Sequence, residues 1–133
     1  MTLQILKGRT VGELQHDFNK AYPFLRVDII KEIKGNNGPI IKQRLTRNID
    51  LAAAGKLKEG MLELGDYMTV GQLEKIFREQ FGINVQVSRK SGPVWLETTV
   101  TDTWTLRQQN EHGRELSIPA KNGIPEERMD WDQ

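Results

Sequence analysis

The 133-residue chain contains no cysteine. This absence excludes disulfide bonds, thiolate nucleophiles and cysteine-ligated zinc or iron–sulfur centres. Histidine is scarce as well, because His16 and His112 are the only two and lie far apart in the chain. The composition therefore predicts neither a metal site nor thiol chemistry.

The chain also lacks long apolar runs and a strong net charge. No segment approaches the roughly 18 apolar residues that span a bilayer, and no basic segment followed by an apolar run opens the sequence, so no signal peptide is expected. Cytoplasmic localisation is the default expectation, without a membrane association. The 19 basic residues nearly balance the 18 acidic ones, so the net charge of +1 provides no global attraction to nucleic acid.

Catalytic motifs are missing too. Gly55-Lys56 suggests a phosphate loop, but Asp50 and Leu57 stand where that motif requires a glycine and a hydroxyl residue. Neither a Gly-x-Ser-x-Gly elbow nor a convergent pair of carboxylates can be identified. We therefore predict a protein that is not an enzyme and has no cofactor.

What the sequence does contain is one phrase written twice: Thr10–Leu14 is TVGEL and Thr69–Leu73 is TVGQL. Thr-x-x-Glu and Thr-x-x-Gln are capping boxes, in which the threonine and the residue three places later bond to each other's backbone amides. Apolar residues at helical spacing follow each box. Glycine in a first helical turn costs stability, so Gly12 and Gly71 predict close approach of another backbone, with a bound ligand as the alternative.

Similar segments surround both helices. Alternating residues predict strands over 3–5 and 25–29 in the first copy and over 62–64 and 83–87 in the second. Gly-Pro turns predict hairpins after them. Asp50 then caps a short helix, and Thr105 with Gln108 forms a third capping box at the start of a helix that is expected to end at Gly113.

The pattern predicts an α+β protein with an internal repeat of two βαββα units, residues 1–60 and 61–116, followed by a flexible tail over 117–133. A ferredoxin-like βαββαβ arrangement is the runner-up. Units of about 60 residues are marginal alone. We therefore expect them to share a sheet or to stack sheet faces.

Protein association is the leading functional hypothesis. Open sheets leave edge strands that pair with other chains, and tryptophan is enriched at interface hot spots. Trp95 and Trp131 are the candidate protein contacts, and a protein partner or self-association is expected.

Nucleic-acid binding is the alternative. It rests on a basic segment over residues 34–60 and on two further cations at the second hairpin, since clustered cations bind phosphates and an exposed aromatic ring can stack on an unpaired base. The candidate contacts are Lys42, Arg44, Arg47, Lys56, Lys58, Arg89 and Lys90.

The stretch TVGQLEKIFREQFGINVQVSRKSGPVWLETT, with DTWTLRQQN after it, resembles hypothetical proteins of Bacteroidetes bacteria. The resemblance extends over residues 61–110. It implies a bacterial cytoplasmic protein but no activity, partner or binding residue.

Overall fold

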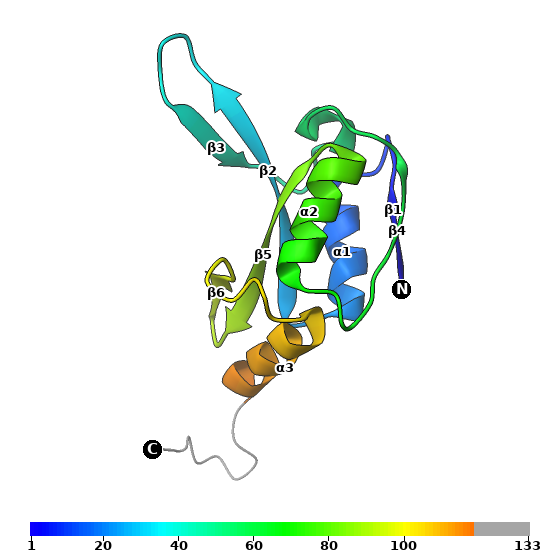
Figure 1. Cartoon of the computed structure of the whole chain (residues 1–133), viewed down its shortest axis with the longest axis vertical. Coiled ribbons are helices and arrows are strands. Elements are labelled where there is room, and N and C mark those ends of the chain that lie inside the picture. The colour runs from blue at the N-terminus through cyan, green and yellow to red at the C-terminus, as the bar shows by residue number, and fades with distance from the viewer. Residues whose placement is uncertain (119–133) are drawn as a thin grey trace.

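A computed structural model describes residues 1–118 and has the mixed α+β fold that the sequence predicts (Figure 1). It contains three α-helices, one 3₁₀-helix and six strands. The first half consists of β1 (Thr2–Ile5), α1 (Val11–Ala21), β2 (Leu25–Lys34), β3 (Ile40–Arg44) and the 3₁₀-helix η1 (Leu51–Ala54). The second half consists of β4 (Gly60–Glu63), α2 (Val70–Phe81), β5 (Asn84–Ser91), β6 (Val94–Glu97) and α3 (Leu106–Ser117).

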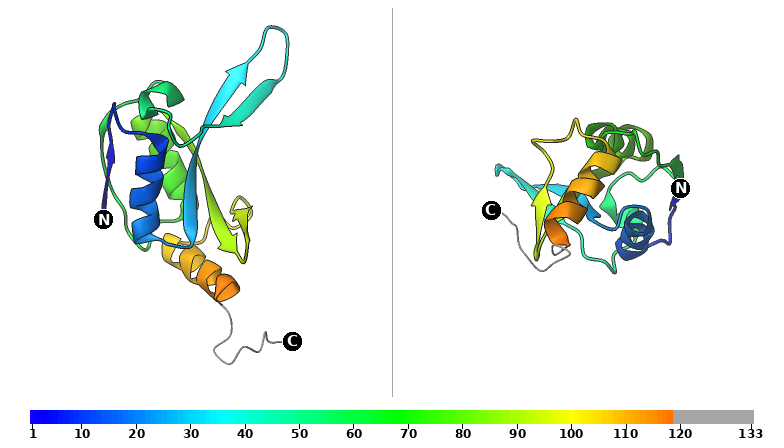
Figure 2. Two further views of the ribbon diagram at one scale, coloured as in Figure 1. Left: turned by 180° about the vertical axis from the view of Figure 1, so that it is seen from behind. Right: turned by 90° about the horizontal axis from the view of Figure 1, so that it is seen from below.

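The elements form three layers, with α1 and α2 between two sheets (Figures 1 and 2). On one side lies the antiparallel pair β1–β4, and on the other lies an antiparallel sheet in the order β3-β2-β5-β6. Both helices bury their apolar stripes in this space; Phe18 of α1 and Phe77 of α2 are fully buried. One continuous core therefore joins both halves of the chain.

The two halves share both sheets. Leu3 of β1 lies opposite Leu62 of β4, and Val27 of β2 lies opposite Val87 of β5. The ferredoxin-like alternative is wrong because that fold places its four strands in one sheet, whereas here β1 and β4 form a sheet separate from that of β2 and β5, which pair with each other. The order of elements in the two halves matches the predicted units, whereas duplication of a whole unit stays a prediction.

The repeated phrase builds the same helix start twice. Thr10 Oγ1 accepts from the amide of Glu13, whose carboxylate accepts from the Thr10 amide. Thr69 and Gln72 make the same reciprocal pair. A third capping box joins Thr105 to Gln108 at the start of α3. All three predicted capping boxes are therefore present.

Loop carbonyls accept hydrogen bonds from the amides of the two residues that follow Thr10 and Thr69. The amide of Gly12 donates to the Arg47 carbonyl at 2.9 Å, and that of Gly71 donates to the Asp102 carbonyl at 2.8 Å. A Cβ atom on Gly12 would lie 3.1 Å from the Arg47 carbonyl oxygen, and one on Gly71 would lie 3.3 Å from that of Asp102. The predicted close approach of another backbone is confirmed at both positions.

The predicted end of the last helix is wrong. Helix α3 continues through Gly113 to Ser117. A Cβ atom at Gly113 would lie 3.0 Å from the side chains of Arg89 and Phe24. Glycine is required there for helix-to-sheet packing and not for termination. The expected boundary between the units, after residue 60, falls inside β4.

Within residues 1–118, no helix combines the length and apolar character that crossing a bilayer requires.

We expect Thr69→Ala to lower the free energy of unfolding by about 1 kcal/mol, because the Gln72 amide loses its side-chain acceptor. Thr69→Ser keeps an oxygen at this position and serves as the control. Urea unfolding followed by circular dichroism measures both variants. An equal loss in the two would mean that the methyl group, and not the hydrogen bond, stabilises the helix start.

Candidate nucleic-acid interface

In the part of the chain that the structure describes, the four-stranded sheet has one face covered by helices and one face without them (Figure 2). The covered face carries Leu25, Val27 and Ile29 of β2, all fully buried. Alternate residues of each strand point to the other face, which we call the open face. Three pairs of residues lie opposite each other on the open face: Arg26 and Ser88, Asp28 and Gln86, and Lys90 and Trp95.

Asp28 organises the centre of the open face. Its side chain is only 4% exposed, although it carries a carboxylate. Oδ2 accepts from Nε of Arg26 at 3.0 Å and lies 3.5 Å from Nε of Arg44. Oδ1 accepts from Nε2 of Gln15 on α1 at 3.1 Å. One buried carboxylate therefore holds two arginines from neighbouring strands, as buried charges require partners.

Trp95 lies at the β6 side of this network. The guanidinium carbon of Arg26 is 5.0 Å from the centroid of its ring, and Nζ of Lys90 is 6.0 Å away. These distances are within the range of cation–π attraction. Ser88 lies between Arg26 and β6 in the register and is 1% exposed. Trp95 is half-buried, while its neighbours Val94 and Leu96 are exposed at 51% and 43%.

On the side of α1, the open face ends at the edge of β2 that does not pair with β3. Nδ2 of Asn19 donates to the Leu25 carbonyl at 3.2 Å, and Nε2 of Gln15 donates to the Val27 carbonyl at 2.9 Å. The Ile29 carbonyl accepts from the amide of Leu45 at 2.9 Å. Side chains and a loop amide thus satisfy this edge where β3 does not reach.

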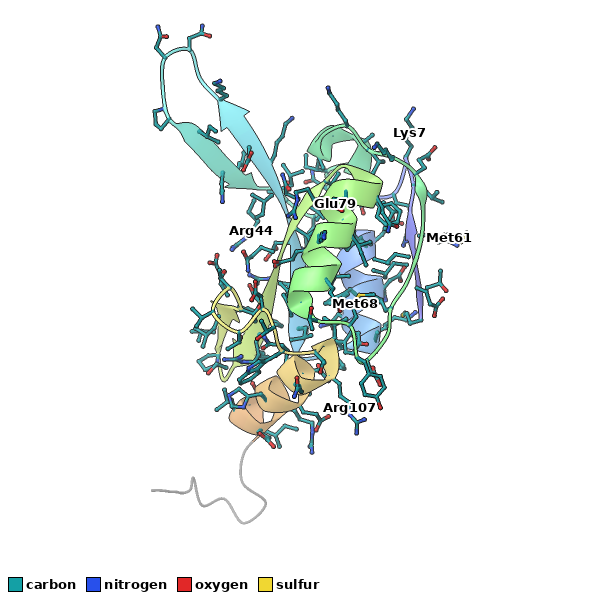
Figure 3. All side chains as sticks on the ribbon, in the orientation of Figure 1. Lys7, Arg44, Met61, Met68, Glu79 and Arg107 are labelled. Atoms are coloured by element: carbon teal, nitrogen blue, oxygen red, sulfur yellow. The ribbon has the colours of Figure 1, made fainter. Side chains whose placement is uncertain are left out.

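A cavity of about 600 Å³ lies in this part of the open face. Helix α1, strands β2, β3 and β6, and the loop after β3 form its walls. The lining residues are Gln15, His16, Asn19, Arg26, Asp28, Arg44, Leu45, Thr46, Arg47 and Trp95. Figure 3 shows Arg44 at the end of β3, on the side of the sheet away from α2.

Beyond the cavity, the β2–β3 hairpin projects from the body as an arm (Figure 1). We define the arm as residues 31–44, all of which are exposed. Its charged side chains are Lys31, Glu32, Lys34, Lys42 and Arg44. Ile33, Ile40 and Ile41 are 42%, 57% and 58% exposed. The arm therefore combines excess positive charge with apolar side chains that have no core to enter.

The structure separates the predicted nucleic-acid contacts into three groups. Lys42, Arg44 and Lys90 lie on the open face by register. Arg47 lies in the loop that docks on the start of α1 and lines the cavity.

The other three candidates lie elsewhere. The segment that contains Lys56 and Lys58 lies beside the C-terminal end of α2. The Lys58 amide donates to the Phe81 carbonyl there at 3.0 Å. Arg89 lies on the covered face, where its Nη1 donates to Oε1 of Gln109 on α3 at 2.8 Å. These positions do not add to the open face.

Of the two predicted protein contacts, Trp95 lines the cavity, and Trp131 lies outside the described residues. The sequence interpretation missed Arg26, Asp28, Gln15 and Asn19. Arg26 and Asp28 occupy the polar positions of the alternating segment 25–29. The alternation therefore places both on the solvent-facing side of that strand, and this signal could have identified them. No comparable pattern singles out the two amides on α1.

The second half has a different charge at the matching place. Glu74 lies 59 residues after Gln15, the same spacing as the repeated phrase, and Gln86 lies opposite Asp28. Oε2 of Glu74 accepts from the Val87 amide at 3.4 Å. Burial raises the pKa of the Glu74 carboxyl above its ordinary value; the charge of Asp102 also raises it, while the Val87 amide and Arg78 oppose the shift.

We expect Asp28→Asn to lower the free energy of unfolding by about 1–2 kcal/mol, because two arginines lose a charged acceptor in a partly buried network. Glu97→Gln is the matched control, since Glu97 lies on the same face but is exposed. It should change stability by less than about 0.5 kcal/mol. Equal effects of the two substitutions in urea unfolding would contradict a structural role for Asp28.

We expect Glu74→Gln to raise stability at pH 7 relative to the natural chain. A carboxyl with a raised pKa in the folded state stabilises the fold when protonated, and this contribution is lost as the pH rises through the folded pKa. The advantage of the glutamine variant should therefore shrink below a pH of about 4, where the Glu74 carboxyl becomes protonated in both the folded and the unfolded state. An advantage independent of pH would contradict this explanation; unfolding curves from pH 3 to pH 8 measure it.

No protein-family model, curated protein or solved structure matched this chain in comparisons with known proteins.

Proposed function

We propose that this protein is a non-enzymatic module that binds nucleic acid across the open face and along the arm. The observation that carries the proposal is the row of cations on one face of one sheet. By register this row comprises Lys90, Arg26, Arg44, Lys42 and Lys34, and Trp95 lies at its β6 end. We call these five residues the basic row.

Few carboxylates lie on the same face as the basic row. Asp28 is buried between two arginines, and Glu32 lies directly opposite Lys42 in the arm. Among the described strand residues, Glu97 is the remaining carboxylate on this face. Cations aligned along a surface attract a phosphate backbone and release its condensed counterions. The local arrangement thus supports nucleic-acid binding despite the nearly neutral whole chain.

The arm gives separate support for a large partner. Two-stranded ribbons that project without a covering layer are marginally stable in water. The exposed isoleucines near the tip would gain burial against a partner, and the lysines beside them favour a partner with negative charge. A polyanion that offers grooves and base surfaces meets both requirements.

Protein association is the second candidate, because three exposed isoleucines and the free edge of β3 also suit pairing with another chain. Under this alternative, charge reversal in the arm would matter less than removal of its apolar side chains. Ile33→Ser with Ile41→Ser would then abolish self-association or capture of a protein partner, which sedimentation velocity and pull-down would detect. Unchanged association in that variant would exclude the arm as a protein contact.

We expect the double variant Lys34→Gln, Lys42→Gln to bind a labelled oligonucleotide roughly tenfold more weakly at moderate salt. The slope of log affinity against log salt should fall by about 1.4, which corresponds to two lost phosphate contacts on a single strand. Fluorescence anisotropy at stepped salt concentrations measures both quantities.

The double variant Lys56→Gln, Lys58→Gln is the matched control. It removes the same charge from the predicted basic segment, but at the end of α2 and away from the open face. Its affinity and salt slope should stay near those of the natural chain. An equal effect of both pairs would indicate that net charge, and not the basic row, attracts the oligonucleotide. The absence of any salt-dependent binding by the natural chain would refute the proposed function.

A further inference from the structure

The cavity on the open face has the dimensions and chemistry of a site for a small part of a larger ligand. Its volume of about 600 Å³ lies in the usual range for ligand pockets, about 300–1,000 Å³. We propose that it receives one nucleotide of an unpaired strand, with the base against Trp95 and the phosphate against Arg44 and Arg47. This inference rests on the proposed function and narrows it to single-stranded nucleic acid.

The arginines are arranged for an anion. Arg26 and Arg44 both approach Asp28 through Nε, which leaves the terminal nitrogens of each guanidinium available to a ligand. Two guanidinium groups share one carboxylate, so the cluster keeps a net positive charge. Arg47 is a third arginine among the residues that line the cavity. Planar guanidinium forks match the oxygens of a phosphate group.

Trp95 supplies a surface for a base. Trp95 lines the cavity, and the guanidinium carbon of Arg26 lies 5.0 Å from the centroid of its ring. Aromatic rings beside cations bind unpaired bases by stacking, largely independently of sequence. In a duplex the faces of the bases are already stacked on their neighbours, so a paired base cannot occupy this wall.

An extended peptide fits the cavity less well. Strand addition requires unpaired backbone groups along a sheet edge. Here the carbonyls of Leu25, Val27 and Ile29 already accept hydrogen bonds from Asn19, Gln15 and Leu45. The charges lining the cavity then favour a phosphate over a peptide backbone.

The experiment uses the full chain with Trp104→Phe and Trp131→Phe, so that fluorescence reports on Trp95 alone. The probes are an unstructured oligothymidylate of about 12 nucleotides, within the span of known single-strand sites, and a duplex of the same length. We expect quenching of Trp95 by the single strand but not by the duplex.

Substitutions at Trp95 separate stacking from charge. In the otherwise natural chain, Trp95→Leu should weaken binding of the single strand by about five- to 150-fold, the usual effect of losing one stacked base, and leave duplex affinity unchanged. Trp95→Phe keeps a ring and should restore most of the affinity. Arg44→Gln removes a half-exposed side chain, so it tests the phosphate contact in a variant that keeps its fold. We expect it to weaken binding of the single strand more than that of the duplex.

The outcomes distinguish this inference from the proposed function. If Trp95→Leu and Arg44→Gln leave single-strand affinity unchanged, while Lys34→Gln with Lys42→Gln lowers it, nucleic-acid binding stands and the nucleotide site is refuted. An equal loss for single strand and duplex in Trp95→Leu also refutes the site. If neither probe binds the natural chain at low salt, both the inference and the proposed function fail.

Discussion

The antiparallel pairing of β2 with β5 holds the two halves of the chain together and determines where a ligand can approach. It opposes Val27 to Val87 and Ile29 to Val85 on the covered face, where α1 and α2 complete a single core to which both halves contribute. β5 pairs with β2 only from Leu25 to Ile30, while β3 pairs with it from Ile30 to Lys34. The far end of the ten-residue strand therefore leaves the body, and the arm is a consequence of this offset.

The order of elements is similar in the two halves, whereas the side chains differ. A threonine caps the start of each central helix, and the amide of the glycine two residues later donates to a loop carbonyl. At matching places, however, Gln15 corresponds to Glu74, and Asp28 faces Gln86. Uncharged Gln15 shares in an arginine network, whereas Glu74 is a partly buried carboxyl with a raised pKa. The fold can thus repeat a stable helix start while concentrating positive charge in one half.

Local features were predictable because their causes are local. Thr10, Thr69 and Thr105 specify capping boxes within four residues of chain, and Gly92 with φ of +59° forms the turn expected between β5 and β6. Gly113 was misassigned because its role depends on Phe24, a residue far away in the sequence that crosses the helix at close range. The candidate site was partly predicted: Arg44, Lys90 and Trp95 belong to it, but the buried carboxylate that organises them was not identified.

The sequence by itself determined the helix starts, the strands and the hairpin turns, since capping and alternation act between near neighbours. Only the tertiary structure decided which charges act together. Arg89 and Lys90 are adjacent in the chain, yet Arg89 lies beneath α3 and Lys90 lies beside Trp95. Arg26 reaches the same ring from a strand more than sixty residues earlier. Successive side chains of a strand point to opposite faces, so register and pairing, and not closeness in sequence, select the members of a surface.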